Sequence, residues 1–226
     1  MLERIRVLIR MCDVGFALSA ASRHHQKLNR IRLQKFIYLL DVVGYLYEIL
    51  PPRKSHVTYK HGPFDAAIQN AVDVLVFRGF AKASNVQRDS AGKIHAAYEL
   101  TPEGSSWVRK VAEDNRFSIR WDAAVEVADK VNSLGWERLV ALVYAEPTFV
   151  NTKSQGYGQK LDLNNGLENS AALLLETINR GLSHGFETTS PDRELIVELF
   201  FRYLDNYSRA EQSRSTTPQR KAGGET

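Results

Sequence analysis

The stretch that decides the fold is YKHGPFDAAIQNAVDVLVFRGF, residues 59–80. Gly62-Pro63 makes a turn, and Pro63 suits the first position of a helix, where its missing N–H would have no partner. Gly79 ends this predicted helix. Its apolar residues follow the spacing of one buried helical face: Phe64, Ala67, Ile68, Ala71, Val72, Leu75 and Val76. Its polar residues are expected to face solvent: Asp65, Gln69, Asn70 and Asp73.

A β-hairpin is predicted directly after this helix. Residues 80–88 and 93–100 are short strand-compatible runs, and DSAG at residues 89–92 joins them as a turn. Thr101 and Pro102 then occupy the positions of an N-cap and a first helical residue. We therefore expect a strand pair followed by another helix.

Two helices are predicted before residue 59. Residues 2–21 carry apolar residues at helical steps, and Asn29 can cap a second helix that Pro51-Pro52 stops. The complete order is helix, helix, helix, hairpin and helix, which is the order of a winged helix-turn-helix domain. We interpret residues 1–115 as this domain, which makes the fold class mainly α with a small β-hairpin (α+β).

The rest of the chain is predicted to be helical. Residues 121–134 and 136–145 indicate two helices, the second ended by Pro147, and further helices are expected at 166–181 and from Ser190. Residues 148–166 between them are interpreted as a long polar loop. From Ser208 the composition cannot offset the entropy of ordering. The predicted division is therefore a helical extension at 116–207, packed on the first domain, and a disordered tail at 208–226.

Composition narrows the class of protein. Of 226 residues, 43% are hydrophobic, enough to bury a core. No run approaches the roughly 18 apolar residues of a membrane span, and the single Cys12 excludes an internal disulfide. We therefore expect a cytoplasmic protein. The net charge is +4, but the first sixty residues hold eleven Lys and Arg against four Asp and Glu, so they could face phosphates or an acidic protein.

Nucleic-acid binding is one hypothesis that this fold suggests. Winged helices commonly place the third helix in the major groove and the wing on the backbone, so Arg, Lys, Asn and Gln on these elements are candidates. The candidate residues are Arg30, Arg32, Lys35, Gln69, Asn70, Arg88 and Lys93. Asp65 and Asp73 on the same helix face would repel phosphate, and all the basic residues could equally be solvated surface charges.

The sequence shows no complete set of residues for a catalytic site. His24 and His25 lack accompanying metal ligands, and Cys12 lies on an apolar helical face, as a core residue would. GYGQK at residues 156–160 lacks the ending of a phosphate loop. We expect no catalytic residues, no metal and no cofactor, and therefore no enzyme.

Several short motifs, taken in their order, resemble a known family. They are LQKFIYLL at 33–40, YKHGPF at 59–64, RGF at 78–80 and LTPEG at 100–104, with a weaker echo in VYAEP at 143–147. This order is similar to that of the Panacea (SocA-like) antitoxin group and of the winged-helix middle components of prokaryotic phage-defence systems. The resemblance covers residues 29–104.

The resemblance implies a regulatory or adaptor protein that acts through protein contacts. Its partner would be a toxin, an ATPase or a protease encoded nearby, with a second copy of the chain as another partner to consider. The residues expected to bind the partner surround the turn: Tyr59, Lys60, His61 and Phe64. Tyr59 and Phe64 could instead simply pack a helix start. A DNA-binding transcriptional regulator on the same domain is the alternative.

Overall fold

The computed structural model describes residues 2–49, 51–52, 55–92, 94–164, 168–186 and 192–216. It is mainly helical with a small antiparallel sheet, which confirms the α+β class. Its elements are α1 (Leu2–Ser22), β1 (Leu28–Asn29), α2 (Arg30–Val43), the 3-10 helix η1 (Gly44–Tyr47), β2 (His56–Val57), α3 (Ala66–Phe77), β3 (Ala81–Arg88), β4 (Ile94–Leu100), α4 (Pro102–Ala112), α5 (Ser118–Leu134), η2 (Trp136–Arg138), α6 (Leu139–Tyr144), α7 (Pro147–Lys153), β5 (Lys160–Leu161), α8 (Ser170–Phe186) and α9 (Arg193–Thr216).

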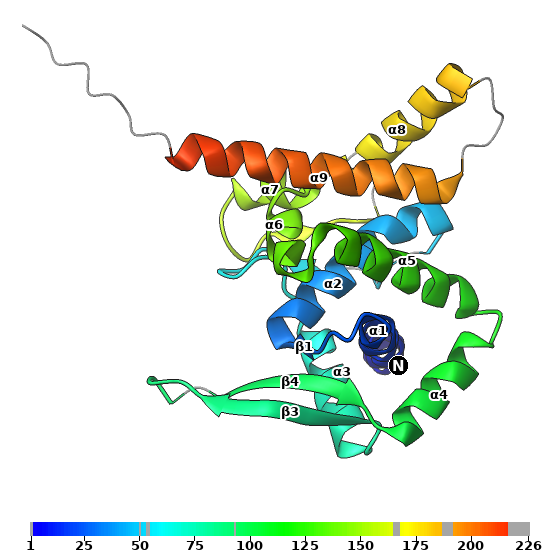
Figure 1. Ribbon diagram of the computed structural model, residues 1–226, viewed down its shortest axis with the longest axis vertical. Coiled ribbons are helices and arrows are strands. Elements are labelled where there is room, and N and C mark those ends of the chain that lie inside the picture. The colour runs from blue at the N-terminus through cyan, green and yellow to red at the C-terminus, as the bar shows by residue number, and fades with distance from the viewer. Residues whose placement is uncertain are drawn as a thin grey trace, which may run out of the picture.

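Helix α2 is the centre of the molecule. Every residue from Leu33 to Val43 is buried, and α1, α5 and α6 pack around it (Figure 1). A helix that is enclosed on all sides must be apolar all round or must pair its polar residues. The side chain of Asn29 accepts a hydrogen bond from the Arg32 N–H, which confirms the predicted cap.

The larger sheet has the strand order β1-β4-β3 and is antiparallel. Leu28 is opposite Tyr98, and Ala81 is opposite Leu100. The hairpin of β3 and β4 closes through a hydrogen bond from Gly92 N–H to Asp89 C=O, as the sequence predicts. This hairpin projects at one end of the molecule, and α9 crosses the opposite end (Figure 1).

Helix α4 starts where the hairpin ends. Thr101 Oγ1 accepts a hydrogen bond from the Gly104 N–H, which confirms the predicted cap. An added Cβ at Gly104 would lie 1.8 Å from Phe80 O, so only glycine allows the first turn of α4 to approach the chain that leads into β3.

Three sequence predictions are wrong in their local detail. Helix α3 begins at Ala66 with Asp65 as its cap, because Phe64 is still extended and pairs with Val57. Pro147 begins α7 instead of ending the preceding helix, since Glu146 accepts hydrogen bonds from the backbone N–H groups of Thr148 and Phe149. The expected loop at 148–166 therefore holds α7, and it also holds β5, which pairs with β2.

The expected disordered tail is helical at its start. Helix α9 continues through Ser208 to Thr216, and ion pairs within it join Arg209 to Asp205 and Arg214 to Glu211. Side-chain pairs at this spacing offset the lack of apolar contacts. Residues 217–226 lie outside the described part of the chain.

One hydrophobic core runs through both predicted parts of the chain. Phe16 of α1 packs on Trp121 of α5, with ring centroids 5.6 Å apart, and Phe36 of α2 stacks on Trp136 at 6.1 Å. Among the helices within the described ranges, none has the length and apolar character needed to cross a membrane.

Candidate functional site

The turn at residues 59–64 forms a projecting corner whose base is buried. Tyr59, Lys60 and His61 are exposed, whereas Gly62 and Pro63 are buried against α2. Gly62 has a φ of +90°, and an added Cβ would lie 2.5 Å from Lys35 Nζ. The positive φ therefore favours glycine here, and a larger residue would also have to displace the end of the Lys35 side chain.

Two side chains of α2 fix this corner from below. Lys35 Nζ donates a hydrogen bond to Pro63 O at 3.1 Å. The Gln34 amide donates to Asp65 O and accepts from Asp65 N, each at 2.9 Å. Because all these groups are buried, the backbone on both sides of Phe64 is held in one position.

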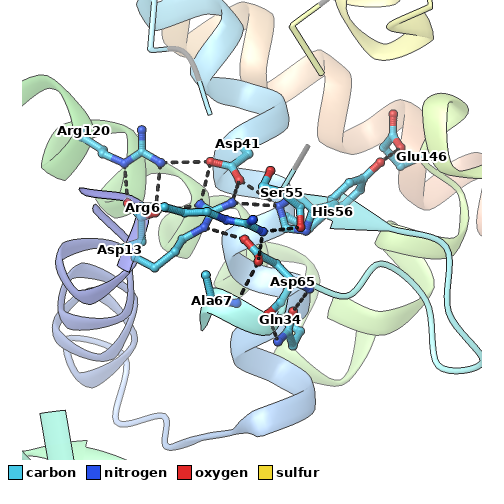
Figure 2. A network of polar contacts seen from close by, with 12 residues as sticks. Arg6, Asp13, Gln34, Asp41, Ser55, His56, Asp65, Ala67, Arg120 and Glu146 are labelled. Atoms are coloured by element: carbon cyan, nitrogen blue, oxygen red, sulfur yellow. Dashed lines mark hydrogen bonds and ion pairs between the residues drawn. The ribbon is translucent and has the colours of Figure 1, made fainter. Parts of the chain in front are cut away.

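A buried network of charged groups fixes the far side of the corner (Figure 2). Arg10, fully buried on α1, is its centre, and its guanidinium reaches three carboxylates: Asp65 at 2.8 Å, Asp13 at 2.7 Å and Asp41 at 2.6 Å. Arg120 of α5 pairs with Asp13 and also reaches Asp41 at 3.0 Å. Arg6 and His56 complete the network. Arg6 lies 2.6 Å from Asp65 and donates a hydrogen bond to Ser55 O at 3.2 Å, and His56 lies 2.8 Å from Asp41.

The network keeps Asp41, Arg10 and Arg120 charged. Burial alone would raise the pKa of Asp41, but Arg10, followed by His56 and Arg120, outweighs burial and holds this pKa well below its usual value. For Arg10, burial alone would lower the pKa of the guanidinium, but the carboxylates of Asp41, Asp13 and Asp65 outweigh burial and raise this pKa. These ion pairs fix α1, α2, α3 and α5 relative to one another, while Arg6 Nε and His56 Nδ1 are buried without a hydrogen-bond partner among the described residues.

A groove of about 150 Å³ opens between the corner and α2. Ile31, Tyr59 and Phe64 give it apolar walls, and the rings of Tyr59 and Phe64 lie 5.4 Å apart. The full lining is Arg30, Ile31, Gln34, Lys35, Tyr59, His61, Gly62, Pro63, Phe64 and Gln69. No Asp or Glu stands among these residues.

Most of the residues expected to bind a partner come together at this groove. Tyr59, His61 and Phe64 line it, and Tyr59 is 53% exposed. Lys60 is exposed on the corner but is not part of the lining.

Only some of the residues expected to bind nucleic acid lie at the groove. Arg30, Lys35 and Gln69 line the groove, whereas the exposed Asn70 and the half-buried Arg32 do not. Arg88 is exposed in the hairpin, where it donates a hydrogen bond to Gly92 O. Lys93 lies outside the described residues.

Two expectations about exposed charges are wrong. Asp65 faces the protein interior because its carboxylate caps α3 and pairs with Arg6 and Arg10. Lys35 is only 2% exposed, since α2 is enclosed on all sides. Asp73 is at the surface as expected, but Arg30 pairs with it at 2.7 Å.

Sequence reasoning missed the centre of the network. The residues that were not candidates are Arg10, Asp13, Asp41, His56 and Arg120. Arg10 and Asp13 are three residues apart on α1, but the partners that join them to other elements are far away in the sequence. One signal was present: Asp41 interrupts an otherwise apolar run between Phe36 and Val43. A carboxylate in such a run needs a buried cation.

The residues considered for catalysis are held by ion pairs, burial or backbone hydrogen bonds. His24 pairs with Asp129 of α5, and burial raises the pKa of the Cys12 thiol to about 12. The glycine-containing loop at 156–160 is bonded to Thr58 through Gly158 N–H and Gly156 O.

Comparison with known proteins adds no relative: no protein-family model matches the chain, and a search of curated proteins finds no match.

Proposed function

We propose that this protein is a non-catalytic regulatory or adaptor component of a prokaryotic toxin-antitoxin or phage-defence system, cytoplasmic, acting through protein contacts. The observation that carries the proposal is the groove beside the rigid corner, where Tyr59, His61 and Phe64 lie together. The resemblance of residues 29–104 to the Panacea group supports the choice of system.

The proposed domain at residues 1–115 is a winged helix-turn-helix. Its support is the element order from α1 to α4, with β1 before α2 and the sheet order β1-β4-β3. In this interpretation α3 is the third helix and the tip between β3 and β4 is the wing.

The groove suits a protein ligand for physical reasons. Aromatic and arginine side chains in a recess are the usual anchors of protein interfaces, and Tyr59 and Arg30 both border it. The corner is held by Gln34 and Lys35, so little order has to be gained on binding. A preorganised surface loses less conformational entropy when a partner docks.

Co-purification tests this proposal. The protein is co-expressed with each product of the neighbouring genes, and complexes are detected by size-exclusion chromatography. We expect a toxin, ATPase or protease to co-elute, and Tyr59→Ala with His61→Ala to weaken the complex at least tenfold. Tyr203→Ala is the matched control, because Tyr203 is exposed on α9 and does not line the groove. Absence of any co-eluting neighbour, or equal loss with the control, would overturn the proposal.

A DNA-binding regulator is the second candidate, and one observation favours it. The two acidic residues that weighed against phosphate are neutralised, Asp65 by burial with Arg10 and Asp73 by Arg30. A groove-reading α3 is therefore less repelled by phosphate than its sequence suggests.

Salt dependence tests this candidate. If the protein binds duplex DNA through the wing, Arg88→Ala should weaken binding and reduce the salt slope by about one. Arg202→Ala on α9 is the control, since Arg202 is also exposed. Salt-independent binding, or an equal effect of both substitutions, would argue against DNA.

A further inference from the structure

The groove contains a buried cation, Lys35, for which the described residues supply no counterion. Lys35 is 2% exposed and lines the groove, and within the described residues its ammonium makes one hydrogen bond, to Pro63 O, and no ion pair. An ammonium has three N–H donors. Arg10 and Arg120, by contrast, are both satisfied by carboxylates.

The surroundings of Lys35 select an anion. None of the ten residues that line the groove is acidic, and Arg30 adds a second cation at its edge. Titratable groups lie on each element that meets there: Lys35 and Arg30 on α2, His61 and Tyr59 on the corner, and Asp73 of α3, which is already paired with Arg30. Lys35 is therefore the positive charge of the groove that the described residues do not compensate.

The shape of the groove favours a carboxylate on a flexible side chain. A space of about 150 Å³ holds one side chain, and its walls, Ile31, Tyr59 and Phe64, would contact the apolar stem or an apolar neighbour. Phosphates of duplex DNA lie on a stiff backbone, so a flexible side chain is the better fit for a recess at whose base Lys35 is only 2% exposed.

We propose that the groove binds an Asp or Glu side chain of a protein partner, flanked by an apolar residue, and that its carboxylate pairs with Lys35. This inference rests on the proposed function, since it names the chemistry of the partner's docking segment. Hydrogen bonds between a carboxylate and an ammonium are the stronger kind, and here the bond would replace an unpaired buried charge.

Two short peptides test the inference without a known partner. The probes are Ac-Gly-Phe-Asp-Phe-Gly-NH2 and the same peptide with Asn in place of Asp. Binding to the full chain is followed by NMR shifts of the backbone amides at 59–62 and 64 at pH 7. We expect the Asp peptide to bind about tenfold tighter than the Asn peptide, the size of a charge-assisted hydrogen bond. In Lys35→Met this preference should disappear.

Matched variants separate the outcomes. Lys110→Met removes an exposed lysine of α4 that does not line the groove, and it should keep the preference. If Lys35→Met does not fold, Lys35→Gln and the wild-type comparison of the two peptides still decide. Equal binding of both peptides, binding of neither at millimolar concentration, or a preference that survives in Lys35→Met would overturn the inference. So would Lys35-dependent shifts caused by a short DNA duplex but not by the Asp peptide, which would make the groove a phosphate site.

The two proposals fail in different ways. If no neighbouring gene product co-elutes but the Asp peptide binds through Lys35, the adaptor proposal fails and the groove chemistry stands. If a partner co-elutes and the peptides do not differ, only the inference about the acidic anchor is lost.

Discussion

Lys35 has an unfavourable position for a charged side chain. Burial lowers its pKa from 10.5 to about 8. Between these two values the unfolded chain binds more protons than the folded protein, so the stability of the fold rises with pH across this window. Below pH 8 the lysine is charged in both states and its destabilising effect is complete. Such a residue is expected where binding takes precedence over stability.

Lys35→Met should therefore stabilise the protein. We expect a gain of about 2 kcal/mol in the free energy of unfolding at pH 7, because the pKa change corresponds to about 3 kcal/mol and the lost bond to Pro63 O removes about 1 kcal/mol. The gain should shrink towards pH 10. Urea denaturation at pH 7 and pH 10 measures the gain in stability and its decrease with pH. Lys60→Met is the control, because Lys60 is an exposed lysine. A gain that does not change with pH would contradict the role of the buried charge.

At the scale of elements, the start of α3 depends on a charge from α1. Asp65 caps the helix through Ala67 N–H and pairs with both Arg6 and Arg10. These two functions can be separated, because asparagine caps a helix as well as aspartate does but carries no charge.

Asp65→Asn should destabilise the protein by about 3 kcal/mol, since it leaves buried positive charge uncompensated. Asp73→Asn is the matched control on the same helix, where the exposed pair with Arg30 predicts a loss of at most about 1 kcal/mol. Both changes are measured by urea denaturation at pH 7. Equal losses in the two variants would mean that Asp13 and Asp41 suffice to keep Arg10 paired.

Rules that depend on neighbouring residues predict the helices and strands better than they predict the contacts between these elements. Helical spacing and the caps Asn29 and Thr101 indicate α2, α3 and α4, and the DSAG turn indicates the hairpin, because each depends on neighbouring residues. The same rule placed Asp65 in solvent, since its partners Arg6 and Arg10 lie more than fifty residues away. The corner residues were found from the turn and the resemblance, whereas the buried state of Lys35 follows only from the packing around α2.

At the scale of the whole molecule, the predicted boundary near residue 115 crosses a shared interior. Arg120 of α5 enters the network of α1 and α2, and Tyr38 of α2 donates a hydrogen bond to Glu146, which caps α7. The hydrophobic core also includes residues from both sides of the boundary. Because the corner depends on the same network through Asp65, groove and helical extension should be stable only together.

Arg120→Met tests this dependence. Removing one arginine leaves Asp13 and Asp41 short of a buried partner, so we expect a loss of about 3 to 4 kcal/mol. Unfolding should remain a single transition, with circular dichroism and tryptophan fluorescence coinciding, because α5 cannot detach without exposing α1 and α2. Arg116→Met is the control, since its pair with Asp114 is at the surface and should contribute far less to stability. Two separate transitions in the wild type would show instead that residues 1–115 fold independently of the helices that follow.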